Sequence, residues 1–134
     1  MKIYEFHQPF YPFRLMICVG RDAIKDFFEI DCAEMEANTY AMTCCRFTKK
    51  EQQQVVIIRF RSVEDISYHN ITHECGHLGI DVFEVVGMPV TSDSSEAFCY
   101  LTGWAAECCA QMKKHSTGDD EGFTGRLVFD TESK

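Results

Sequence analysis

The sequence predicts an α+β fold in which a small, mostly antiparallel sheet with a short N-terminal helix packs on two antiparallel C-terminal helices. Two observations support this prediction. Short runs rich in β-branched and aromatic residues dominate the first sixty positions, whereas apolar residues recur at steps of three and four after residue 61. A chain of 134 residues fits a single domain and can bury a usable core.

The first segments are short. Residues 2–7 and 13–19 look extended, and the second of these runs ends at Gly20. The apolar positions within residues 22–30 suit a short helix. The N-terminal part of the chain is therefore expected to contribute two strands and one helix.

Residues 38–47 and 54–61 are the clearest strand candidates. The run 55–58 is β-branched throughout, which favours a pleated and buried strand. The polar residues 48–51 between the two runs predict a hairpin turn, although they include no glycine.

The period-three-and-four pattern predicts one long helix over residues 63–86. Ser62 can cap its start, with Asp65 at the reciprocal position of a capping box. Gly87 is suited to the C-terminal cap, and Pro89 follows where a helix could not continue.

A second helix is predicted to begin near Ser94 or Ser95 and to present an apolar face to the core. Two lysines and His115 lie in its last turn, where the helix dipole favours positive charge. We expect a single domain over residues 1–115 and a polar, partly flexible tail over residues 116–134, in which 126–129 could form a short strand or contact a partner.

The formal net charge is -8 and is unevenly distributed. Residues 1–61 carry nine Lys and Arg against eight Asp and Glu, whereas residues 62–134 carry four against thirteen. This balance argues against a nucleic-acid partner and suits a cation or a basic ligand, although solubility alone would also explain it. No run of about 18 apolar residues occurs, so no membrane-spanning segment is expected.

The eight cysteines are interpreted as reduced, mostly buried thiols of a cytoplasmic protein. Adjacent pairs such as Cys108 and Cys109 are poorly placed for disulfides, and no C-x-x-C pair occurs that would indicate a cysteine zinc cluster. The first twenty residues also show no basic start followed by a long apolar stretch, as an export signal would require.

The residues with the clearest chemical meaning are His73-Glu74-Cys75-Gly76-His77, an H-E-x-x-H motif. Positions four apart lie on the same side of a helix, so both imidazoles can reach one ion. Zinc binds imidazole nitrogen and prefers four ligands. Glu74 can approach a water at the metal without binding the metal itself, which is the position of a general base. The alternative is a helix with two solvated histidines and a solvated glutamate.

Glu96 is the best candidate for a third protein ligand. It lies nineteen residues after His77, at the start of the next helix, and a returning antiparallel helix would bring it back to the histidine pair. Asp93 is the alternative third ligand. The extended motif with a third histidine is absent, because Ile80 and Phe83 occupy the required glycine and histidine positions.

Several neighbours of the motif have weaker functional interpretations. Tyr100 could stabilise an oxyanion, but an aromatic residue at that spacing also suits the core. Asp81 lies one turn after His77 and could hydrogen-bond its ring, and His69 could line the cleft, although a solvated helix face explains both equally well. Cys75 falls among apolar positions and is interpreted as core rather than as a nucleophile.

Over residues 73–104 the sequence resembles the gluzincin metallopeptidases, which hold zinc with two histidines and one glutamate. It is also similar to small phage- and prophage-encoded H-E-x-x-H proteins, in which a small sheet precedes two helices. The resemblance implies a zincin-like fold, with His73, His77 and Glu96 as ligands and Glu74 as the base. Larger members place an acidic residue one turn after the glutamate ligand, where this chain has Tyr100.

The resulting hypothesis is a zinc-dependent peptidase that acts on a peptide or protein substrate, with the strand over residues 55–61 as the edge of the cleft. One alternative is a zinc-binding phage accessory protein with little or no catalysis. Another is a regulatory peptidase of the kind that cleaves repressors.

Overall fold

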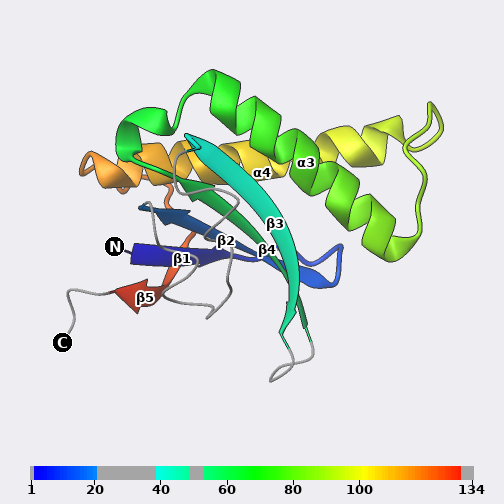
Figure 1. Cartoon of the computed structure of the whole chain (residues 1–134), viewed down its shortest axis with the longest axis horizontal. Helices are drawn as coiled ribbons and strands as arrows, with labels where there is room; N and C mark the ends of the chain where they lie inside the picture. Colours follow the sequence, from blue (N-terminus) through cyan, green and yellow to red (C-terminus); the bar gives the residue numbers. More distant parts are fainter. Residues whose placement is uncertain (1, 21–38, 49–52, 131–134) are drawn as a thin grey trace.

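The structure is a computed structural model that describes residues 2–20, 39–48 and 53–130. The chain folds as an α+β protein with a five-stranded sheet and two long helices, as the sequence predicts (Figure 1). The helix expected over residues 22–30 and the turn at 49–52 lie outside the described residues. The elements in chain order are β1 (Lys2–Phe6), β2 (Phe13–Val19), β3 (Ala41–Thr48), β4 (Gln53–Phe60), η1 (Val63–Asp65), α3 (Tyr68–Val86), α4 (Ser95–Ser116) and β5 (Arg126–Asp130).

The strands are ordered β3-β4-β2-β1-β5. β3 pairs antiparallel with β4, and β1 pairs antiparallel with both β2 and β5. β2 and β4 run parallel, so the sheet is mixed although most of its pairings are antiparallel. Because β4 lies between β3 and β2, the expectation that residues 55–61 form the edge of a cleft is wrong. Within the described residues the edge on that side is β3, which lies beside α3 (Figure 1).

Both faces of the central strands are buried, and both helices lie on the same side of the sheet (Figure 1). Val56 and Ile58 face the helices and pack with residues such as Leu78, whereas Val55 and Ile57 belong to a second buried cluster. Side chains alternate between the two faces of a strand, so a strand buried on both faces needs a continuous apolar run. Burying each such side chain stabilises the fold by about 1.5–3 kcal/mol.

The helix predicted over residues 63–86 is interrupted near its start. The first turn is the separate 3-10 helix η1, and α3 begins only after Ser67, whose hydroxyl accepts a hydrogen bond from the backbone N–H of Asn70 at 3.2 Å. Ser62 does not cap a helix through its side chain, and its hydroxyl instead donates to Oδ2 of Asp65 at 2.8 Å. The break places Ile66 in the core. The predicted capping box is therefore wrong, because the Ser62 hydroxyl bonds to the Asp65 carboxylate and the backbone leaves helical geometry at Ile66, where ψ is 79°.

The other helix boundaries agree with the sequence. Gly87 caps α3 with a φ of 74°, a left-handed conformation that glycine adopts without a steric penalty. After the turn that contains Pro89, α4 begins at Ser95, where the sequence predicts it.

α3 and α4 approach each other closely at Gly79. A Cβ atom built there would lie 2.7 Å from Phe98 and 2.7 Å from Thr102, which is closer than real Cβ contacts. The rings of Phe98 and Phe83 also meet edge to face at 5.4 Å. The absence of a side chain at this one position therefore sets the spacing of the two helices that carry the candidate functional residues.

The segment beyond residue 115 is anchored to the sheet through β5, which pairs with β1. His115 at the end of α4 contacts the hydroxyl of Tyr4 at 2.7 Å through Nε2 and Asp120 through Nδ1, and its ring stacks on Phe123. This confirms the expected short strand near residues 126–129. The division of the chain at residue 115 stays a prediction. Over the described ranges, neither helix combines the length and the apolar character needed to cross a bilayer.

Candidate metal centre

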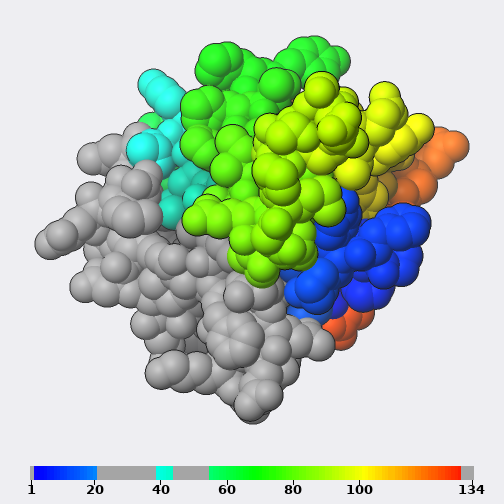
Figure 2. Space-filling model, turned by 90° about the vertical axis from the view of Figure 1, so that its right-hand side faces the viewer, coloured from blue at the N-terminus to red at the C-terminus, as the bar shows by residue number. Residues whose placement is uncertain are grey.

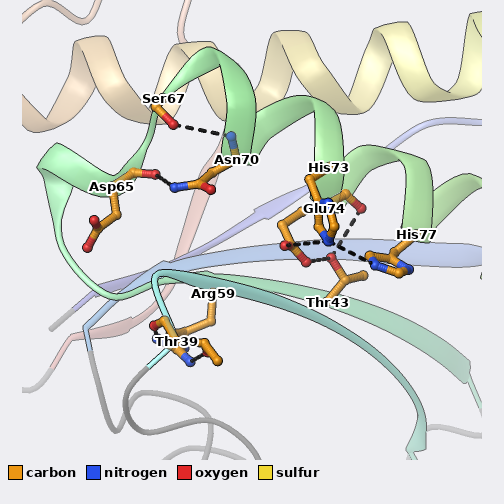
Figure 3. A network of polar contacts seen from close by, with 9 residues as sticks. All are labelled: Thr39, Thr43, Arg59, Asp65, Ser67, Asn70, His73, Glu74 and His77. Carbon is orange, nitrogen blue, oxygen red and sulfur yellow. Dashed lines mark hydrogen bonds and ion pairs between the residues drawn. The ribbon is translucent and has the colours of Figure 1, made fainter.

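The two histidines of the H-E-x-x-H motif converge on one face of α3 (Figure 3). The Nε2 atoms of His73 and His77 lie 3.2 Å apart, and the two rings meet edge to face at 4.8 Å. Two nitrogen ligands on a tetrahedral zinc ion, each at about 2.0–2.1 Å, would be separated by roughly 3.3 Å. The pair therefore fits a shared ion, although the same separation also allows one imidazole to donate a hydrogen bond to the other.

The carboxylate between the two histidines is buried and anchored to the sheet. Glu74 is only 5% exposed, in contrast to the side chain of His73, which is 58% exposed. The hydroxyl of Thr43 on β3 lies 2.7 Å from Oε1 of Glu74 and 3.1 Å from its backbone carbonyl oxygen (Figure 3). The second carboxylate oxygen, Oε2, lies 4.0 Å from Nε2 of His73. One oxygen is thus held by the edge strand while the other lies beside the histidine pair.

Thr43 is a residue that sequence analysis did not identify. It lies 31 positions before Glu74, and the two residues meet only because β3 packs beside α3. Threonine is ordinary in a strand, so nothing in the local sequence distinguishes Thr43 from other threonines. Its contact orients the carboxylate in the way that a supporting hydrogen bond orients a group at a metal site.

Glu96, the expected third ligand, is not brought to the histidine pair. It is exposed in the first turn of α4, and four residues later Tyr100 is exposed on the same helix face. The face of α4 that packs on α3 carries Phe98 and Thr102 instead. Across the described part of the chain, no group of three or more His, Cys, Asp or Glu side chains could hold a metal ion. The assignment of Glu96, and the alternative of Asp93, stay predictions.

Asp81 and His69 lie close to the H-E-x-x-H histidines, whereas Tyr100 lines a separate pocket. Partial burial raises the pKa of the Asp81 carboxyl above its usual value, the charge of His77 lowers it, and the charge of Glu84 raises it. Asp81 is therefore close enough to His77 for their charges to interact. The ring of His69 is stacked with that of His73 at 6.2 Å. Tyr100 is 76% exposed and lines a separate pocket beside residues 7–11.

Most cysteines of the two helices lie in the core, as the sequence predicts for Cys75. Cys75, Cys108 and Cys109 are buried free thiols, whereas Cys99 is an exposed free thiol. Burial raises the pKa of the Cys108 thiol to about 12. A hydrogen bond with Cys75, followed by burial, raises the pKa of Cys109 well above its usual value. The Cys108 and Cys109 thiols therefore stay protonated at neutral pH and are poor nucleophiles or metal ligands.

Comparison of the chain with protein-family models, with curated protein sequences and with solved structures finds no match.

Proposed function

We propose that the chain is a zinc-dependent peptidase with a zincin-like arrangement, in which His73 and His77 bind the metal. The observation that supports this proposal is the 3.2 Å separation of the two Nε2 atoms, next to a carboxylate that is buried and held in place. Buried carboxylates are rare unless they are paired or hydrogen-bonded, and Oε2 of this one lies 4.0 Å from Nε2 of His73.

A zinc ion at the pair would polarise the peptide carbonyl and make a nearby water more acidic. Glu74 accepts the proton of that water and returns it to the leaving amine as the bond breaks. Thr43 keeps Oε1 of Glu74 fixed through its hydroxyl, which leaves Oε2 directed toward the reacting water.

Glu96 is proposed as the third ligand, and this role requires a rearrangement. Its position on the exposed face of α4 means that the first turn of α4 must rotate or unwind before the carboxylate can reach the imidazoles. In the turn before α4, the hydroxyl of Ser94 donates to the carbonyl of Pro89 at 2.6 Å and accepts from the backbone N–H of Thr91 at 2.9 Å. Local movement at an exposed helix end costs little compared with opening the core.

An extended peptide could bind beside this site by pairing with β3. β3 is an edge strand within the described residues, and its Thr43 contacts the proposed base. Backbone pairing at an open edge recognises a peptide without requiring one sequence. The buried thiols suit a reducing compartment, and we propose a cytoplasmic location on that basis.

The test measures the zinc content of the purified chain and its hydrolysis of a library of unstructured peptides. Hydrolysis should be lost on chelation and restored by zinc. Glu74→Gln should lower the rate by about 10²–10⁴-fold while zinc stays bound, because only the proton acceptor is removed. Glu84→Gln, a matched change at an exposed glutamate of the same helix, should leave the rate unchanged. Full activity of Glu74→Gln would refute the proposed base.

A zinc-binding accessory protein without catalysis is the second candidate, and one observation favours it. The contact between Thr43 and buried Glu74 ties β3 to α3, so the carboxylate already has a structural role that needs no reaction. In that case the chain would bind zinc but hydrolyse no peptide. Glu74→Gln would then lower only the stability of the fold.

A further inference from the structure

A pocket of about 560 Å³ lies between residues 7–11, which connect β1 to β2, and the first half of α4. Figure 2 shows these two segments side by side at the surface, the connection in blue and the start of α4 in yellow. Four of the residues that line it are aromatic, namely Phe10, Tyr11, Tyr100 and Trp104. We refer to it as the aromatic pocket.

Part of the aromatic pocket is preformed. The ring of Trp104 meets Phe13 edge to face at 6.2 Å, and the ring of Tyr11 lies 6.3 Å from that of Phe83. A single buried side chain shapes the connection: Oε1 of Gln8 accepts hydrogen bonds from the backbone N–H groups of Phe10 at 2.7 Å and Tyr11 at 2.8 Å. Walls that are already ordered lose little conformational entropy when a ligand binds.

The other two aromatic rings are largely free. Phe10 is 84% exposed and Tyr100 is 76% exposed, and they belong to the two segments that form opposite sides of the aromatic pocket. Single exposed apolar side chains are common on protein surfaces. Two of them at one preformed aromatic cavity instead indicate rings that can close on a ligand.

The charge around the aromatic pocket favours a positive ligand. No lysine or arginine lines it, and the only ionisable side chains among its lining residues are His7 and the two tyrosines. Glu96 and Glu107 are exposed on the same stripe of α4 as Tyr100, one four positions before it and the other seven after it. Aromatic faces attract cations through their negative quadrupole, and exposed carboxylates on the same helix stripe as Tyr100 add to this attraction.

We propose that the aromatic pocket binds an organic ammonium ion, with Trp104 and Tyr11 as its fixed walls and Phe10 and Tyr100 as its mobile ones. The site is separate from the histidine pair, because it uses the face of α4 that does not pack on α3. It therefore needs no zinc, and its failure would leave the peptidase proposal untouched.

The test compares choline with its uncharged isostere 3,3-dimethylbutan-1-ol, which has the same shape but no positive charge. Trp104 is the only tryptophan in the chain, so its fluorescence reports on this pocket alone. Choline should give a saturable change with a dissociation constant on the order of 1–10 mM, about tenfold tighter than the alcohol. Equal binding of the two probes, or no saturable change with choline, would overturn the proposal.

Variants test the assignment of the walls. Tyr100→Ala and Phe10→Ala should each weaken choline binding by about threefold or more, since each removes one aromatic face. Both side chains are mostly exposed, so circular dichroism and the melting temperature should not change. Tyr68→Ala is the matched control, because Tyr68 is 93% exposed on the first turn of α3 and does not line the aromatic pocket. Unchanged choline binding in both pocket variants would contradict the assignment.

Discussion

The histidine pair on α3 and the aromatic pocket beside α4 are built in opposite ways. The pair is polar and its members lie four residues apart on one helix, and the carboxylate of Glu74 between them is held from outside the helix by the hydroxyl of Thr43 on β3. The aromatic pocket is apolar and forms only where residues 7–11 meet α4, with ring packing holding two of its walls. A site within one helix depends on local periodicity, whereas a site between distant segments depends on the fold that brings them together.

The largest expected effect is on the affinity of the histidine pair for zinc. His77→Ala should weaken zinc binding by more than the roughly 10- to 100-fold that loss of a supporting contact costs, because a direct ligand is removed. His69→Ala changes another exposed histidine one turn before His73 and should alter the affinity far less. Isothermal titration of the three proteins with zinc measures this. Equal losses in the two variants would mean that the ions bind to exposed imidazoles without a defined pair.

A change at Gly79 tests the contact between α3, which carries the histidine pair, and α4, which lines the aromatic pocket. Gly79→Ala should lower the free energy of unfolding by about 1–3 kcal/mol, because the new Cβ would overlap Phe98 and Thr102. Gly103→Ala is the matched control on α4, where an added Cβ meets nothing within 4 Å, and it should raise stability by about 0.5–1 kcal/mol. Urea denaturation compares them. Stabilisation by both alanines would show that the helices are farther apart than described.

Thr43 links the H-E-x-x-H motif to the sheet, because its hydroxyl on β3 contacts Glu74. Thr43→Val keeps the shape of the side chain but leaves Oε1 of buried Glu74 without its donor, so stability should fall by about 1–3 kcal/mol. Peptide hydrolysis should fall about tenfold, since the base is no longer oriented. Thr43→Ser retains the hydroxyl and should therefore keep most of the stability and most of the rate of peptide hydrolysis. Hydrolysis that is equally low in the serine variant would assign the effect to packing instead of the hydrogen bond.

The smallest expected effect is on choline binding when Glu96 is changed. The same change tests whether Glu96 acts near the aromatic pocket or as the third zinc ligand. If Glu96 acts only through its charge beside the aromatic pocket, Glu96→Gln should weaken choline binding about twofold and leave zinc affinity unchanged. If it is the third zinc ligand, zinc affinity should fall by more than about tenfold. Glu107→Gln, the other exposed glutamate of that stripe, should affect choline alone. Unchanged binding of both ligands in Glu96→Gln would remove Glu96 from either role.

The sequence alone determined most of the elements. Periodicity and end signals located α4 and the end of α3, and β-branched runs located β4. The predicted start of the helix was wrong, because a capping pattern at Ser62 could not reveal that the backbone leaves helical geometry at buried Ile66. Helix and strand patterns are local properties, and they fail where burial in the core outweighs them.

The sequence by itself also determined that His73 and His77 face the same way, because a spacing of four residues on a helix requires it. Only the tertiary structure decided that β3 packs beside α3, that Thr43 holds Glu74, and that Glu96 is exposed in the first turn of α4. These features depend on how far each helix is rotated and which strand takes the edge. Packing of the whole core sets both, and no short segment of sequence contains that information.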